Sequence, residues 1–141
     1  MVWAEWMRGI LGRKEPEHLR RGRLGEQAAK RHLRKIGLKF LTANFKTKRG
    51  EIDLIFRDDD CLVFVEVKTR SSEEWSRPAA AVDAGKKRRL SKVAMEYLKQ
   101  LNDRRVKFRF DIVEVLWGDG QAREIRHLPN SFGLAKPYRH H

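Results

Sequence analysis

The stretch GEIDLIFRDDDCLVFVEVKTR, residues 50–70, decides the fold of this 141-residue chain. Two apolar runs, residues 51–57 and 61–69, lie on either side of the three aspartates at 58–60. Short runs rich in Val, Ile and Phe are typical of strands, and consecutive aspartates are typical of a tight turn. The stretch therefore predicts a β-hairpin with antiparallel strands.

The rest of the chain supplies helices and strands around this hairpin. Before it, an apolar stripe at helical spacing predicts a helix over 19–36. After it, Asp83 is a suitable N-cap for a second helix that ends near Leu101. The remaining segments are predicted as strands over 40–46, 106–117 and 122–128 and as a loop over 71–81.

These elements follow one another in the order α-β-β-β-α-β-β. The second helix has to cross over between the hairpin and the fourth strand, which places helices against a mixed sheet. We therefore expect an α/β domain with a mixed β-sheet flanked by helices. The domain is expected over 19–132, after an N-terminal amphipathic segment and hinge over 1–18 and before a C-terminal tail over 133–141.

The chain is strongly basic, with 32 Lys and Arg against 19 Asp and Glu and a formal net charge of +13. This balance favours a polyanion as partner, first a nucleic acid and second an anionic lipid surface. The single cysteine, Cys61, excludes an intramolecular disulfide and fits a reducing, cytoplasmic location. No apolar run approaches the roughly 18 residues of a transmembrane helix. Trp3 and Trp6, at helical spacing, could let the N-terminus contact a membrane or a partner.

Three charged side chains interrupt the two strands of the hairpin. Strict alternation places the apolar residues at 52, 54 and 56 on the core face and Asp53 on the other face. In the next strand it places Glu66 and Lys68 together on one face. Antiparallel pairing then brings Asp53 near them. A buried charge without a partner costs several kcal/mol, so these side chains must neutralise one another or bind something.

Two interpretations are open at this point. In the first, Lys68 neutralises Glu66 or Asp53 in an ion-pair cluster on a half-exposed sheet face. In the second, Asp53, Glu66 and the backbone carbonyl of Val67 form a hard oxygen site for Mg²⁺ or Mn²⁺. Such an ion can lower the pKa of a bound water and hold a phosphoryl oxygen. Lys68 would then orient or deprotonate the water, or stabilise the transition state.

Asp53, followed by Glu66-Val67-Lys68 on the next strand, resembles the PD-(D/E)xK nuclease signature, with Ile52 where the signature has its proline. The segments GRLGEQAA, GEIDLI and VFVEVKTR together resemble the YraN family of bacterial proteins, which is similar to archaeal Holliday-junction resolvases. The resemblance covers residues 21–132. It implies a restriction-endonuclease-like fold, with Asp53 and Glu66 as metal ligands and Lys68 as the catalytic lysine.

The same resemblance implies Glu26, in the first helix, as an additional acid at the site. The sequence supports this placement, because Glu26 flanks the inward stripe of that helix, although its carboxylate could instead reach solvent. Resolvase-like enzymes act as dimers on two-fold junctions, so the resemblance also favours a homodimer.

Basic residues near the predicted site are candidates for phosphate contacts. Lys86 falls on the apolar stripe of the second helix at its N-terminus, where the helix dipole attracts anions. Lys87 and Arg88 are either further phosphate contacts or part of a solvated basic turn. Arg70 is expected to contact the scissile region or to pair locally with an acid, and Arg23 to add a phosphate contact.

The leading hypothesis is a Mg²⁺-dependent, structure-selective DNA endonuclease that acts in repair or recombination. Because no base-reading motif is found, branched or single-stranded DNA is the expected substrate. One alternative is a non-catalytic nucleic-acid-binding module of the same fold. The other is an accessory protein that docks on a membrane or a partner through its N-terminus.

Overall fold

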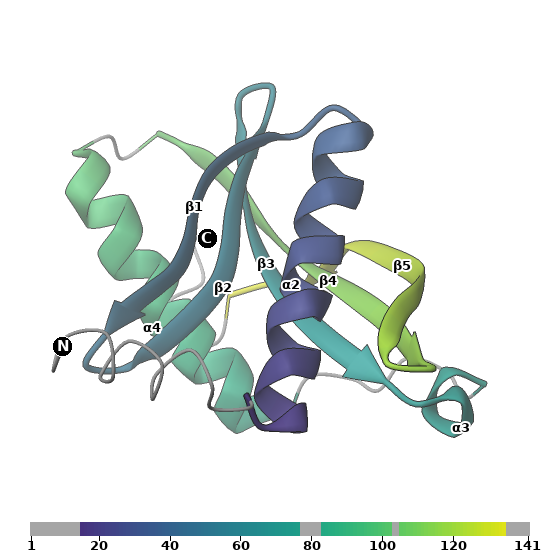
Figure 1. The fold of residues 1–141 in the computed structure, drawn as a ribbon. Coiled ribbons are helices and arrows are strands. Elements are labelled where there is room, and N and C mark those ends of the chain that lie inside the picture. Colours follow the sequence, from purple (N-terminus) through teal and green to yellow (C-terminus); the bar gives the residue numbers. More distant parts are fainter. Residues whose placement is uncertain (1–14, 77–82, 103–104, 135–141) are drawn as a thin grey trace, which may run out of the picture.

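A five-stranded β-sheet lies between two long helices in the computed structural model, which describes residues 15–76, 83–102 and 105–134 (Figure 1). The strands follow one another across the sheet in sequence order; β3 and β4 are parallel, and the other neighbours are antiparallel. This arrangement confirms the predicted α/β fold class and element order. The elements are α2 (Glu17–Lys35), β1 (Lys39–Thr47), β2 (Gly50–Asp58), β3 (Cys61–Arg70), α3 (Ser72–Trp75), α4 (Ala84–Leu101), β4 (Lys107–Gly118) and β5 (Gln121–Phe132).

The two long helices cover opposite faces of the sheet, because successive strand residues point to opposite sides. On one face, Leu33 of α2 belongs to a buried core with Phe56 and Val65. On the other face, Val93 of α4 belongs to a second core with Phe64. β3 is buried on both sides, which explains its nearly continuous apolar run. Glu66, the last residue of the fully buried part of β3, therefore has no solvent face to occupy, whereas Lys68 and Arg70 beyond it are partly exposed.

Several boundaries differ from the prediction. α2 begins at Glu17, and β5 continues to Phe132, where it still pairs with Phe110 of β4. Residues 72–75, predicted as loop, form α3 because Ser71 and Glu74 make a reciprocal capping box. The tryptophans of the predicted N-terminal segment and most of the predicted C-terminal tail lie outside the described residues. None of the described helices is long and apolar enough to cross a membrane.

The strict alternation predicted for β2 is wrong at Asp53. Ile52 packs in the core beneath α4, whereas Leu54 packs in the core beneath α2, so the strand reverses its faces between these residues. Asn44, opposite Asp53 in the β1–β2 register, has a φ of 54°. Ala43 and Phe45, on either side of Asn44, pack against the same two cores as their partners Leu54 and Ile52, so both strands change faces at this pair without a register shift. Regular pairing of β2 with β3 begins only at Leu54↔Val65, so Asp53 lies where the two strands separate.

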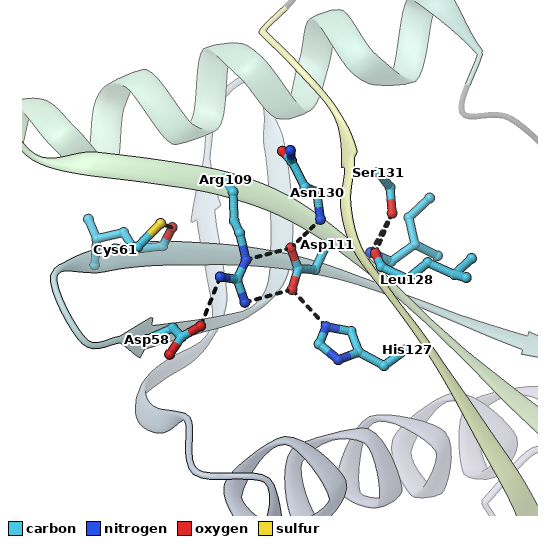
Figure 2. A network of polar contacts seen from close by, with 10 residues as sticks. Asp58, Cys61, Arg109, Asp111, His127, Leu128, Asn130 and Ser131 are labelled. Carbon is cyan, nitrogen blue, oxygen red and sulfur yellow. Dashed lines mark hydrogen bonds and ion pairs between the residues drawn. The ribbon is translucent and has the colours of Figure 1, made fainter.

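A polar network joins β2, β4 and β5 near the β2–β3 turn (Figure 2). The carboxylate of Asp111, 0% exposed, accepts hydrogen bonds from Arg109 Nε at 3.0 Å and the Asn130 backbone N–H at 2.9 Å. It shares a third hydrogen bond of 2.7 Å with His127 Nε2, and Arg109 also contacts Asp58 at 2.8 Å. Burial acts to raise the pKa of Asp111, but these hydrogen bonds outweigh it and lower the pKa. The network thus holds a stable buried anion that connects three strands.

Candidate active site

Two acidic side chains from neighbouring strands meet where the β2–β3 ladder ends. Asp53 Oδ2 accepts a hydrogen bond from the Val67 backbone N–H at 2.8 Å, so its carboxylate occupies the place of a ladder carbonyl. The carboxyl groups of Asp53 and Glu66 share a hydrogen bond, and Glu66 is only 9% exposed. The structure thus brings together the two acids that the sequence placed on adjoining strands. We call Asp53 and Glu66 the acid pair.

The acid pair cannot carry two full negative charges at neutral pH. Burial, followed by the charge of Glu66, raises the pKa of Asp53 to about 8. The hydrogen bond from Val67 opposes this rise, and the charge of Glu26 adds to it. Two carboxyl groups in contact in a buried site share one proton, since ionising both is costly. A cation that replaced this proton would remove the repulsion.

Two lysines lie at the acid pair. Lys86, in the first turn of α4, forms an ion pair with Glu66 Oε1. The side chain of Asp83 accepts a hydrogen bond from the Lys86 backbone N–H at 2.9 Å, which confirms the predicted N-cap and fixes this end of the helix. Lys68 points to the same sheet face as Glu66. Burial, followed by the charges of Lys86 and Arg70, lowers the pKa of Lys68, so a larger share of this amine is unprotonated at a given pH and able to accept a proton.

Glu26 reaches the same group of acids from α2. Burial, followed by the charge of Glu51, raises the pKa of Glu26. A side-chain hydrogen bond with Asn44 opposes the rise, and the charge of Glu66 adds to it. Asn44 is the left-handed residue beside Asp53, so the irregularity in β1 also provides a partner for the helix acid.

Gly25 sets how closely α2 approaches the site. It is buried against β3, and a Cβ built at this position would lie 2.5 Å from Thr69 Oγ1. A real Cβ does not come that close, so any larger residue would have to move the helix or turn the threonine side chain. The absence of a side chain at Gly25 therefore holds Glu26 near the sheet.

Gly25→Ala is expected to destabilise the protein by about 1–3 kcal/mol relative to Gly22→Ala, because overpacking strains a close helix–strand contact. At Gly22 nothing lies within 4 Å of an added Cβ, so that variant gains helix propensity alone. Urea denaturation measures both changes. In the Gly25→Ala, Thr69→Ala double variant, which lacks Oγ1, most of the loss should be recovered. Equal stability of the two single alanine variants would contradict the close contact.

Arg70 pairs locally with acidic side chains, which was one of the two roles predicted for it. Its Nε contacts Glu114 of β4 at 3.2 Å and its Nη1 contacts Glu74 of α3 at 3.1 Å. Glu114 is 2% exposed and also meets Arg126 Nη1 of β5 at 3.4 Å. Because Arg70 forms ion pairs with both Glu114 and Glu74, it belongs to the structural scaffold beside Lys68.

The other predicted phosphate contacts lie on two helices. Arg23, inside α2, makes hydrogen bonds of 3.0 and 2.8 Å to the Glu15 carboxylate, and both side chains are exposed. Lys87 is half-buried and Arg88 is exposed in the first turn of α4, directly after Lys86. Among the contacts of the described residues, Lys86 is the only one of the predicted phosphate-binding residues that forms an ion pair with the acid pair.

Glu114 and Arg126 are residues that the sequence did not single out. Glu114 interrupts an apolar strand, as Glu66 does. The pattern that singled out Glu66, an acid within a run of apolar residues, therefore occurs a second time in the sequence. The parallel β3–β4 register makes Glu114 the direct neighbour of Lys68. That register could not be read from the sequence, because it depends on where the α4 crossover returns the chain.

The acid pair fits a hard divalent cation in its donor chemistry. Its donors are carboxylate oxygens, which Mg²⁺ and Mn²⁺ prefer. Because an extended residue directs its N–H and C=O to the same side, the Val67 carbonyl faces the side on which Asp53 lies. No group of three or more His, Cys, Asp and Glu side chains within the described ranges is arranged to hold a metal. Mg²⁺ commonly binds through one or two carboxylates and keeps several waters, and two carboxylates are what the acid pair offers.

Known proteins match this chain over most of its length. Residues 25–115, which contain Glu26, the acid pair and both lysines, match the model for the Uncharacterised protein family UPF0102. A UPF0102 protein of Trichlorobacter lovleyi is 40% identical over 115 residues, which cover 81% of this chain and 91% of the relative. One from Symbiobacterium thermophilum is 45% identical over 112 residues, covering 79% and 94%. One from Syntrophomonas wolfei is 43% identical over 111 residues, covering 79% and 96%.

Proposed function

The chain belongs to the UPF0102 family, which the resemblance to YraN proteins predicted, and from its acid pair we propose that it is a Mg²⁺- or Mn²⁺-dependent endonuclease that hydrolyses phosphodiester bonds in DNA. We propose branched or single-stranded DNA in repair or recombination as the substrate. The observation that carries this proposal is the hydrogen-bonded contact of Asp53 and Glu66 beside two lysines in a chain of net charge +13. Such a site attracts a cation at its centre and a polyanion around it.

The residues of the site divide the proposed work among them. Asp53 and Glu66 would hold the ion, which supplies Lewis-acid polarisation of a phosphoryl oxygen and a lowered pKa of water. Lys68 Nζ, whose pKa is lowered, accepts a proton or stabilises the charge that develops on the phosphate. Lys86 binds a phosphate oxygen at the α4 N-terminus when another cation neutralises Glu66. Glu26 adds negative charge that favours a divalent ion.

The proposal is tested by incubating the purified protein with labelled branched, single-stranded and duplex DNA. With Mg²⁺ or Mn²⁺ we expect nicks in the branched or single-stranded substrates, and with a chelator no nicks. Glu66→Ala should bind DNA but not cleave it, since it lacks one of two ion-holding carboxylates. Cleavage by Glu66→Ala at the wild-type rate would reject the assignment.

A second candidate function, a nucleic-acid-binding module without catalysis, is favoured by one observation. Lys86 forms an ion pair with Glu66, so the negative charge of Glu66 is already neutralised by the protein without a metal ion. A pure binder would show DNA affinity that depends on divalent ions only through ordinary screening. Comparing DNA affinity in MgCl₂ and in NaCl of equal ionic strength therefore separates the two functions, because only the endonuclease should gain affinity specifically with Mg²⁺.

A further inference from the structure

Charged side chains lead from the acid pair across the sheet to Trp75. Lys68 on β3, Glu114 on β4 and Arg126 on β5 are direct neighbours in the register, so they lie on one sheet face. We call these three residues the charged row. At its end, the Arg126 guanidinium lies over the Trp75 ring, 4.0 Å from its centre, and Arg126 Nη2 donates a hydrogen bond to the Trp75 carbonyl at 3.1 Å.

The short helix that carries Trp75 is tied down at several points. Ser71 and Glu74 form the capping box, and Glu74 also accepts a hydrogen bond from Arg70 Nη1 at 3.1 Å. Arg126 adds its contacts with the ring and the backbone of Trp75. A four-residue helix has almost no stability of its own. These contacts therefore fix the position of Trp75 relative to the charged row and to the acid pair beyond it.

Trp75 belongs to neither hydrophobic core of the described residues, and its side chain is only half-buried. Fixing a large aromatic ring outside the core gains little for folding. Proteins that bind single-stranded nucleic acid place aromatic rings in this way, beside positive charge, because a ring stacks on any unpaired base. The guanidinium over one face holds the ring and adds positive charge where phosphates would pass.

We propose that Trp75 is a stacking site for an unpaired nucleobase of the DNA strand that crosses the charged row toward the acid pair. The inference rests on the proposed function and specifies its substrate as a strand that is unpaired at this point. In an intact duplex each base is already stacked on its neighbours and paired, so it offers no free face to Trp75. The site would thereby select single-stranded or branched DNA without reading the sequence.

Binding of the full-length protein to labelled DNA, measured by fluorescence anisotropy in EDTA, tests the stacking site without any cleavage. Trp75→Ala should lower the affinity for a single-stranded oligonucleotide by about 5- to 150-fold, and the affinity for a duplex of the same sequence by less than about twofold. Trp75→Phe should retain most of the binding. Trp117→Ala is the matched control, because this tryptophan of β4 also lies beneath an arginine, at 5.7 Å, but the arginine is Arg20 of α2 and Trp117 is not part of the charged row.

A scan with an abasic nucleotide, moved one position at a time along the oligonucleotide, tests the contact from the DNA side. One position should weaken binding of the wild type and have no further effect on Trp75→Ala, as expected for two partners of one contact. This scan needs only the wild type and Trp75→Phe if Trp75→Ala does not fold. Equal losses on single strands and duplexes, or no sensitive position with the wild type, would overturn the inference.

The outcomes for the two proposals can be told apart. If the wild type cleaves but neither Trp75 variant nor any abasic position changes single-strand binding, the stacking site is rejected and the endonuclease stands. If the wild type cleaves nothing while single-strand binding still depends on Trp75, the endonuclease is rejected and the stacking site stands. If the wild type binds no DNA at all, both are rejected.

Discussion

Replacing Asp53 by Asn is expected to abolish metal-dependent cleavage and, in the same variant, to stabilise the fold above neutral pH. Cleavage should fall by more than about 100-fold. Loss of a side chain that only hydrogen-bonds to a metal ligand already lowers activity by up to about 100-fold, and Asp53 is itself a proposed ligand. Asn keeps an oxygen that can accept the Val67 N–H, whose hydrogen bond to Asp53 measures 2.8 Å. It removes the charge that opposes Glu66. Both effects come from the carboxylate of Asp53, which would hold the ion when charged and which burial, followed by the charge of Glu66, makes costly to ionise without one.

The expected pH dependence follows from the raised pKa of Asp53. Its ordinary pKa is 3.8, and in the folded protein it is about 8. Between these values the folded state holds a proton that the unfolded state has lost, so the stability of the wild type falls as pH rises through this window, by up to about 1.4 kcal/mol per pH unit. Asp53→Asn lacks this loss. Chemical denaturation without divalent ions measures the difference in free energy of unfolding between Asp53→Asn and the wild type. This difference should grow from pH 5 to about pH 8 and then stay constant.

Addition of Mg²⁺ gives a second readout that does not need cleavage. An ion that binds only the folded state stabilises it by about 2.7 kcal/mol at 100 times its dissociation constant. Mg²⁺ should therefore stabilise the wild type at pH 8 and leave Asp53→Asn nearly unchanged. Glu51→Gln is the matched control, since Glu51 is a neighbouring acid with a 36% exposed side chain. An Asp53→Asn variant less stable than the wild type at pH 8 would contradict the shared-proton description.

Replacing Asp111 by Ala is expected to destabilise the protein by about 3–5 kcal/mol, the effect of leaving a buried ion pair without one partner. The substitution leaves Arg109 Nε, the Asn130 N–H and His127 Nε2 without their common acceptor. For a domain of this size the midpoint of thermal unfolding should fall by about 10 °C or more. Circular dichroism on heating measures the change.

Asp60→Ala provides the control for this prediction. Asp60 also belongs to a salt bridge between the β2–β3 turn and β4, with Lys107 at 3.0 Å, but both side chains are well exposed. Exposed pairs contribute about 0–1 kcal/mol, so its unfolding midpoint should stay close to that of the wild type. If Asp111→Ala and Asp60→Ala lowered the midpoint equally, the buried network would have no special part in stability.

The elements that could be predicted are those whose signal is local. The β2–β3 hairpin, the Asp83 cap and the amphipathic α4 each depend on a few consecutive residues, and the structure confirms them. The α3 capping box was also written in the sequence, as Ser71 with Glu74 three residues later, but the polar composition around it suggested a loop. The end of β5 was missed because its last residues are held by pairing with Phe110, not by their own propensity.

The site could be predicted only as far as neighbouring strands determine it. Proximity of Asp53 to Glu66 follows from one hairpin, so the sequence was sufficient. The reversal of faces at Asp53 was not foreseen, because it depends on the left-handed Asn44 of another strand. Glu114 and Arg126 needed the register of β3, β4 and β5, which is set by a crossover and a second hairpin. Periodicity along one strand carries no information about such lateral neighbours.

The carboxylate that completes the β2–β3 ladder has an implication for how this family can diverge. Because the side chain at 53 serves both as a structural acceptor for Val67 and as half of the acid pair, most substitutions there would loosen the strand end as well as remove one of the two proposed metal ligands. Asn would keep the hydrogen-bond acceptor for the Val67 N–H and remove the negative charge. On the proposed function, a relative that binds DNA without cleaving it would thus be expected to carry Asn at this position and to lose less stability as the pH rises toward 8.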